Sequence, residues 1–377
     1  MPIPLRTALI GEQSGAEICP ERLIILDQAS QSFTFENVNE PPLLSINRDF
    51  SAPVVLAADR KPGELERLAQ SDTDPFARYE AIQELMMGAL TAGARGEVVD
   101  AEPVIRAIGA TLKSNALDPA FKAEAILVPS ETLIAERMDV VDPDAIHASR
   151  EALRKAIGTA LSGELLAAHR SDGVEGDDLS PRAKGIRRLR TVALGLLAGA
   201  DEAQAAALAK AQFDRADNMT DRQGALGILV STETPEREAA LDAFYQRFDD
   251  PLVLDKWFAL QAAAQRADTV DQVLKLAKHP DFSMTNPNRL RSLAGMFGGN
   301  HWAFHSADGR GYQFLADMII AADRINPQIA ARLVPAFGRW KRFEPKRSAM
   351  MRASLERIVA TPGLSKDVFE QASKSLA

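Results

Sequence analysis

Two hydrophobic patterns divide the chain near residue 60. Before that point, short apolar runs alternate with turn-forming residues such as Cys19-Pro20, and Phe33 and Phe35 show the period of two that is typical of a half-buried strand. The runs lie at Leu23 to Leu26, Ser32 to Glu36, Leu43 to Ile46 and Val54 to Leu56. About four or five short strands make a marginal sheet. The pattern therefore predicts a partial, incomplete β-sandwich over residues 1–58.

After Pro62 the apolar residues recur at helical spacing as far as Ala377. One apolar stripe of a helix, with residues four apart, comprises Leu153, Ile157, Leu161 and Leu165. The runs suggest roughly 14–18 helices of modest length joined by short loops. Many short helices in series, without a sequence period of about 34 or about 40 residues, predict stacked helical hairpins. We therefore expect a mainly α chain, with an α-solenoid or superhelical array over residues 63–377.

The starts of many helices are marked by a short polar residue followed by proline. Proline suits the first helical position because its fixed φ is helical, and the polar side chain caps free N–H groups. These pairs are Asp74-Pro75, Asp118-Pro119, Asp142-Pro143, Ser180-Pro181, Thr234-Pro235, Asp250-Pro251, Asn286-Pro287 and Asn326-Pro327. Each precedes an apolar periodic run and predicts a helix start.

Composition and charge exclude several classes of protein. The 44 basic and 52 acidic residues give a net charge of −8, which argues against a protein that grips nucleic acid through a cationic surface. The longest apolar stretches, such as Val192 to Ala200, are shorter than the ~20 residues that a bilayer requires, so no membrane partner is expected. A single cysteine, Cys19, excludes a disulfide framework and fits a cytoplasmic location.

Candidate catalytic residues are few. A zinc hydrolase helix needs His-Glu-x-x-His, but Trp302 follows His301 where the glutamate would stand before His305. Local hydrogen bonding is therefore the favoured interpretation of both histidines. Cys19 has no histidine in the same β region and is not favoured as a nucleophile. We expect no catalytic residue and no metal site in this chain.

Two basic clusters, residues 182–190 and 339–347, suggest a second kind of chemistry. Trp340 and Phe343 are interleaved in the second cluster, and mixtures of aromatic and basic residues can bind single-stranded nucleic acid. On an acidic protein, solvated helix faces paired with nearby carboxylates are the favoured interpretation of both clusters.

The segment from Phe282 to Tyr312 is dense in polar, aromatic and glycine residues. It contains Arg289 and Arg291, whose planar guanidinium groups bind carboxylates in a fixed geometry. A concave solenoid face with such arginines could hold a peptide backbone or a C-terminal carboxylate.

Several motifs resemble the C-terminal region of the bacterial aminopeptidase N family, zinc peptidases of the gluzincin group. They are Asn218 to Arg222, Asp255 to Phe258, Phe282 to Met284, Asn286 to Leu293, Phe304-His305, Asp308-Gly309, Gly311-Tyr312 and Asn326 to Gln328. The β region is similar too, around Ser32 to Val38 and Phe50 to Val54. The likeness covers nearly the whole chain.

The resemblance implies a four-part zinc enzyme that removes N-terminal residues from peptides. In that family a β domain, a thermolysin-like catalytic domain and a small β-sandwich precede a large helical domain, which encloses a chamber over the zinc. The family's catalytic motifs, Gly-Ala-Met-Glu-Asn and His-Glu-x-x-His, are absent from this sequence. The chain is therefore expected to be the scaffold and lid portion, inactive alone. Its implied partners are the zinc-bearing catalytic domain of the same polypeptide and peptide substrates.

By position, Arg291 and Arg332 match the arginines that reach into the family's chamber, and Arg289 is a further candidate. A fixed cation there would suit the carboxylate end of a peptide whose amine lies at the zinc. The alternative for each arginine is a structural salt bridge. For the whole chain, the alternative is a non-enzymatic helical solenoid that binds peptides or a partner protein. An in-frame His-Glu-x-x-His upstream of Met1 would decide for the peptidase.

Overall fold

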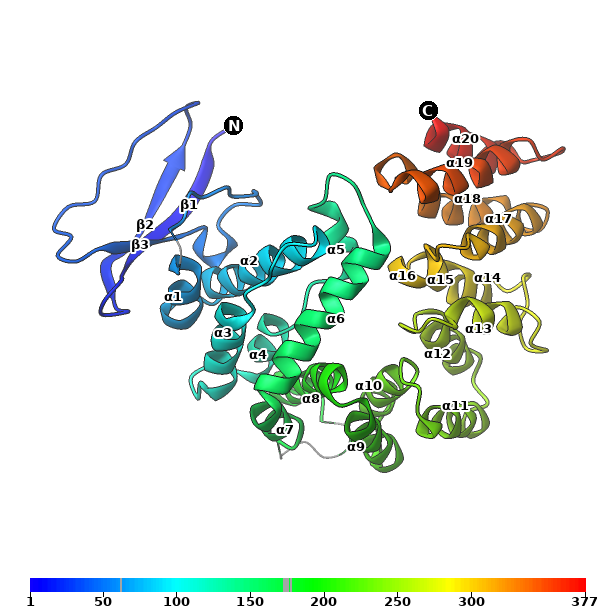
Figure 1. The fold of residues 1–377 in the computed structure, drawn as a ribbon, viewed down its shortest axis with the longest axis horizontal. Coiled ribbons are helices and arrows are strands. Elements are labelled where there is room, and N and C mark those ends of the chain that lie inside the picture. The colour runs from blue at the N-terminus through cyan, green and yellow to red at the C-terminus, as the bar shows by residue number, and fades with distance from the viewer. Residues whose placement is uncertain (62, 172–175, 177) are drawn as a thin grey trace. The chain divides into compact units, whose positions relative to one another are not determined.

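The computed structural model describes residues 1–61, 63–171, 176 and 178–377, and these form two compact units. The first unit comprises Met1–Pro129 and Arg150–Asp201. The second comprises Ser130–Ser149 and Glu202–Ala377. Figure 1 labels the helices and strands of both. The predicted mainly α architecture, an array of short helices that follows a small sheet, is confirmed.

The first unit begins with a three-stranded antiparallel sheet in the order β2-β1-β3. Its strands are β1 (Ile3–Gly11), β2 (Glu17–Leu26) and β3 (Pro42–Ile46). In the central strand, Leu5 lies opposite Ile24 of β2, and Leu9 lies opposite Leu44 of β3. β1 was not predicted because Pro2 and Pro4 obscure its alternation, and the expected turn at Cys19-Pro20 lies inside β2.

The strands expected at residues 32–36 and 54–56 are not formed in the described part of the chain. The alternation of Phe33 and Phe35 does reflect sidedness, since the guanidinium carbon of Arg22 lies 3.7 Å from the ring centroid of Phe35. Arg22 also donates to the carbonyl of Thr34 at 2.9 Å. A side chain therefore takes the place of a backbone ladder here, and no strand results.

Arg48 joins the sheet to the helices of the first unit. It lies in the short 3-10 helix η1 (Arg48–Phe50) and is 4% exposed. Its Nη1 lies 3.0 Å from Glu17 of β2, and its Nη2 lies 3.5 Å from the buried carboxylate of Asp72. Because a buried guanidinium needs such partners, Arg48 ties the sheet to the approach to the next helix.

Six helices lie wholly in the first unit, and α6 (Pro143–Ala160) ends in it. They are α1 (Glu64–Ser71), α2 (Pro75–Ala94), α3 (Glu102–Lys113), α4 (Pro119–Ala125), α7 (Ser162–His169) and α8 (Pro181–Ala200). All eight polar-proline pairs begin helices, as predicted. Asp74 illustrates the physical reason, because its carboxylate accepts the N–H of Ala77 at 2.8 Å. Thr234 is the exception without a side-chain cap.

The predicted apolar stripe is buried, but it belongs to two helices. Leu153 and Ile157 lie on α6, Leu165 lies on α7, and the helix is interrupted at Leu161. On the same stretch, α6 crosses α8 closely at Gly158, where an added Cβ would lie 2.4 Å from the carbonyl oxygen of Leu196. The absence of a side chain therefore permits this approach of two backbones.

The second unit contains α5 and the start of α6, followed by the rest of the helical array. Its helices are α5 (Glu131–Glu136), α9 (Glu202–Arg215), α10 (Met219–Leu229), α11 (Pro235–Arg247), α12 (Pro251–Ala262), α13 (Thr269–Leu276), α14 (Pro287–Leu290), α15 (Met296–Gly298), α16 (His301–Phe304), α17 (Arg310–Asp323), α18 (Pro327–Leu333), α19 (Pro345–Val359) and α20 (Lys366–Leu376). A π-helical turn η2 (Arg291–Gly295) and the 3-10 helices η3 (Val334–Phe337) and η4 (Trp340–Arg342) connect some of them.

Consecutive helices of the second unit pack along the chain, for example α9 with α10 and α17 with α18. A cluster of buried aromatic rings, Phe297, Phe304, Tyr312 and Phe337, forms the core around α16 and α17. The described residues form twenty α-helices, more than expected, because the single run at 287–304 is divided into several short ones. Across the described ranges, none of the helices has the length and apolar character needed to cross a bilayer.

Candidate functional site

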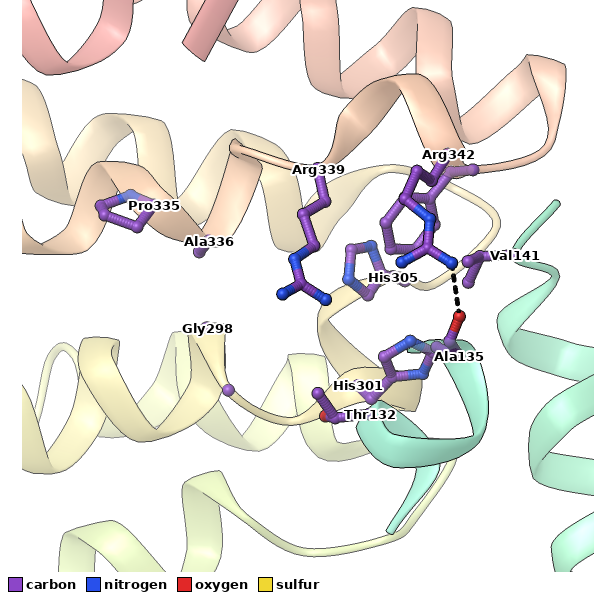
Figure 2. A pocket seen from close by; sticks show the side chains of 12 residues that line it. Thr132, Ala135, Val141, Gly298, His301, His305, Pro335, Ala336, Arg339 and Arg342 are labelled. Atoms are coloured by element: carbon purple, nitrogen blue, oxygen red, sulfur yellow. Dashed lines mark hydrogen bonds between the residues drawn. The ribbon is translucent and has the colours of Figure 1, made fainter. Parts of the chain in front are cut away.

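A pocket of about 210 Å³ lies in the second unit between α5, the turn from α15 to α16, and the 3-10 helices η3 and η4. Figure 2 shows two histidines and two arginines converging on it. The polar side chains that line it are Thr132, His301, His305, Arg339 and Arg342.

The segment that carries α5 is held against the C-terminal helices by backbone pairing. The N–H of Val141 donates to the carbonyl of Arg342 at 2.7 Å, and the N–H of Glu344 donates to the carbonyl of Val141 at 3.0 Å. Arg342 then closes the end of α5, because its Nη2 donates to the carbonyls of Ala135 and Met138 at 3.0 and 2.5 Å. The last carbonyls of a helix have no partner within the helix, so this guanidinium acts as a C-cap.

Arg347 reinforces the same junction from α19. Its side chain is 5% exposed and donates to Asp144 at 2.6 Å, to Glu344 at 3.2 Å and to the carbonyl of His305 at 2.5 Å. One buried cation therefore fixes the start of α6, the N-cap of α19 and the end of α16.

The two histidines of the pocket are buried and uncharged near neutral pH. Burial, helped by the charges of His301 and Arg347, holds the pKa of His305 well below its usual range. Its Nδ1 lies 2.9 Å from the hydroxyl of Tyr312, and its ring stacks on Phe343 at 4.2 Å. Burial also lowers the pKa of His301, against the opposing charge of Glu131.

A second layer of side chains lies behind His301. The ring of His147 stacks on Trp302 with centroids 3.6 Å apart, and its Nδ1 lies 2.7 Å from the carboxylate of Glu131. The other oxygen of Glu131 lies 4.0 Å from Nδ1 of His301. This buried carboxylate therefore faces both imidazoles, but in the part of the chain that the structure describes no three His, Cys, Asp or Glu side chains form a metal-binding group. The described residues thus do not fit a zinc centre.

The three arginines predicted to line a substrate channel lie outside this pocket and in different environments. Arg289 is buried, its Nε donates to Asp255 at 2.6 Å, and its guanidinium lies 5.0 Å from the ring centroid of Phe258. Arg291 is exposed at the start of η2 and bonds to its own helix, at the carbonyl of Pro287 and the side chain of Asn288. Their role in a channel stays a prediction.

Arg332 is exposed on α18. Among the described residues, no carboxylate lies within ion-pair distance of it. Arg291 and Arg332 therefore both present a cation to solvent, whereas the cation of Arg289 is neutralised by Asp255.

The interpretation of the basic clusters as solvated faces is correct for some members and wrong for others. Arg339 is exposed and pairs with Glu136 at 2.7 Å, as expected. Arg347 and Arg187 are buried instead, at 4% and 3% exposure. Sequence reasoning missed them because a run of basic residues does not reveal which side chains meet distant carbonyls and carboxylates; the interleaved Trp340 and Phe343 were the available signal.

Known proteins similar to this chain extend well beyond it. Aminopeptidase N of Caulobacter vibrioides is 42% identical over 359 residues, which are 94% of this chain and 42% of that protein. Aminopeptidase N of Escherichia coli is 37% identical over 93% of this chain and 41% of its own length. The chain thus spans less than half the length of the curated relatives that it matches, and the resemblance stated from the sequence is confirmed.

A solved structure shows the same fold. Aminopeptidase A of Legionella pneumophila, crystallised in complex with aspartic acid, matches all of this chain and 45% of its own with a TM-score of 0.89 and 32% identity. Residues 1–59 match the family model described as a domain of unknown function (DUF3458) with an Ig-like fold. Residues 63–377 match the model described as a domain of unknown function (DUF3458_C) with ARM repeats. The chain therefore belongs to the DUF3458_C family of armadillo-repeat domains.

Proposed function

We propose that this chain is the C-terminal scaffold and lid portion of an aminopeptidase N, an enzyme that removes N-terminal residues from peptides. The observation that carries the proposal is the similarity to two such proteins over more than nine-tenths of this chain but less than half of theirs. The described residues contain no metal-binding group. Zinc would therefore be held by the part of the polypeptide that this chain does not match, where it would activate water.

In this proposal the exposed arginines serve the substrate. Arg291 and Arg332 present guanidinium groups without a carboxylate partner among the described residues. A peptide bound by its amine at the zinc would direct its carboxylate toward such cations, and a charge-assisted hydrogen bond would orient it. Arg289, already paired with Asp255, would support the segment rather than contact the peptide. The single free cysteine is consistent with a cytoplasmic location.

A chimera tests the proposal directly. The matched 42% of the Caulobacter vibrioides protein would be replaced by this chain, and hydrolysis of an aminoacyl-p-nitroanilide and of a tripeptide would be measured. We expect the chimera to bind zinc and cleave both substrates. The matched control is the Caulobacter protein truncated at the same junction without this chain, which should lose peptide cleavage.

Two results would contradict the proposal. A folded, zinc-loaded chimera that is no more active than the truncated control would show that this chain does not act as the lid. Binding of one zinc per chain by the isolated protein would show that it carries its own metal centre. A non-enzymatic peptide-binding solenoid would then be the better description.

A further inference from the structure

The pocket between α5, α16, η3 and η4 contains a buried histidine that points into it. The side chain of His301 is 9% exposed, and within the described residues neither of its ring nitrogens has a hydrogen-bond partner. Figure 2 shows its ring next to Thr132 at the floor of the pocket. A buried imidazole that cannot pair within the protein favours a polar group of a bound molecule at this position.

Arg339 supplies a cation on the opposite side of the same pocket. Its side chain extends toward the histidines in Figure 2, and its Nη1 is engaged by Glu136 at 2.7 Å. In the described part of the chain, no acceptor bonds its Nε or Nη2. The guanidinium therefore keeps one edge of its planar fork for an acceptor in the pocket.

The remaining charges leave the pocket cationic. Arg342 lines it and is held by the carbonyls of Ala135 and Met138, which are neutral partners. Glu136 offsets one of the two arginine charges, and Glu131 lies behind His301 with one oxygen bound by His147. An anionic ligand is therefore favoured over a cationic or neutral one.

The rest of the wall is apolar and limits the size of the ligand. Ala135, Val141, Pro335, Ala336 and Phe343 line it. A volume of about 210 Å³ lies below the range that drug-sized ligands occupy. Inorganic phosphate would leave this apolar surface in contact with water, whereas a carboxylate with a short hydrocarbon tail would cover it.

We propose that this pocket binds a small organic carboxylate. Its oxygens accept hydrogen bonds from the free edge of Arg339 and from an N–H of His301, and its hydrocarbon part packs on Val141 and Ala336. A planar carboxylate matches the planar fork of an arginine, which fixes its orientation. The site lies within one unit and needs no zinc domain, so it goes beyond the proposed enzymatic role and is tested independently of it.

The test uses the full chain and 4-methylpentanoate as the probe. Binding would be followed by titration calorimetry and by the ring signals of the five histidines in NMR spectra. We expect saturable binding in which the signals of His301 and His305 shift, while that of His279, which lies among Tyr245, Trp257 and Phe258, does not. The neutral isostere 4-methylpentanamide and inorganic phosphate should each bind at least about tenfold more weakly.

Substitutions then identify the residues responsible. Arg339→Gln and His301→Phe should each weaken binding of 4-methylpentanoate by about tenfold or more. Arg324→Gln, an exposed arginine at the end of α17, is the matched control and should bind like the unaltered chain. Equal binding of acid and amide, or binding that Arg339→Gln leaves unchanged, would overturn the proposal. Absence of saturable binding would also overturn it, and tighter binding of phosphate would assign the pocket to that anion instead.

Discussion

Arg347 of α19 and Asp144 of α6 form an ion pair with 2.6 Å between Nη2 and Oδ2, although 203 residues separate them in the chain. The two partners are not equivalent, because the side chain of Arg347 is 5% exposed and that of Asp144 is 57% exposed. The loss of each partner therefore has a different consequence.

We expect Arg347→Ala to lower the free energy of unfolding by about 3–5 kcal/mol, because it leaves Glu344 and the carbonyl of His305 without their buried partner. Asp144→Ala should cost only about 1 kcal/mol, since this carboxylate is largely solvated. Urea denaturation monitored by circular dichroism measures both. Arg352→Gln, which removes an exposed pair with Glu356, is the control and should cost less than about 0.5 kcal/mol. Equal effects of Arg347→Ala and Asp144→Ala would contradict this assignment.

Gly158→Ala should destabilise the chain, because the new Cβ would lie 2.4 Å from the carbonyl oxygen of Leu196 and would push α6 from α8. The expected loss is about 1–3 kcal/mol, typical of overpacking. Gly88→Ala is the matched control: it lies in the middle of α2, and a Cβ there meets nothing within 4 Å. That change should stabilise by about 0.4–1 kcal/mol through helix propensity and the unfolded chain. Differential scanning calorimetry should therefore show shifts of opposite sign, and two shifts of the same sign would contradict the prediction.

Acid should weaken the second unit through its pocket histidines. Burial lowers the pKa of His301 and, more strongly, that of His305, whereas a histidine in the unfolded chain titrates near 6.5. Below about pH 6.5 the unfolded state therefore binds protons that the folded state does not, so stability is highest above this pH and falls as pH decreases toward the folded pKa values.

The measurement is the urea midpoint between pH 7.5 and 5.5. His305→Asn cannot titrate in this range, so its midpoint should depend less on pH than that of the unaltered chain. If the two curves run parallel, His305 does not contribute to the acid sensitivity.

Within the chimera described above, Arg291→Ala should reduce kcat/KM for tripeptides about ten- to hundredfold and affect aminoacyl anilides much less, because only peptides offer a carboxylate. Its melting temperature should change little, since Arg291 is exposed and bonds only to its own helix. Arg289→Ala should instead lower the melting temperature markedly, because it leaves Asp255 unpaired in a buried site. Equal losses on peptides and anilides for Arg291→Ala would make its role structural.

The helical architecture was predictable because its signals are local. A capping side chain followed by proline acts within one turn, so pairs such as Asp118-Pro119 indicate a helix start whatever lies around it. The strand at residues 32–36 failed for the opposite reason. Alternation of Phe33 and Phe35 reports sidedness, but a strand also needs a backbone partner, and here Arg22 supplies a side chain instead.

The candidate site was harder to predict because its parts come from distant segments. His301 and His305 were noticed for their spacing, but nothing near them in the sequence indicates Glu131 or Arg339 as neighbours. Arg342 shows the same difficulty, since it caps a helix 207 residues away at Ala135. Contacts of that sequence separation leave no periodicity for a sequence pattern to reveal.

The backbone pairing of Val141 with the segment around Phe343 also constrains how the protein is made. During synthesis at about 5–20 residues per second, α5 leaves the ribosome roughly 10–40 seconds before Arg342, which must cap it. Until then the excursion at Ser130–Ser149 is a nascent loop with its apolar residues uncovered, while the chain on either side can already condense. A ribosome that stalls before Arg342 would thus release a product whose first unit can fold but whose second unit cannot close, which makes this excursion the natural place for a chaperone to bind.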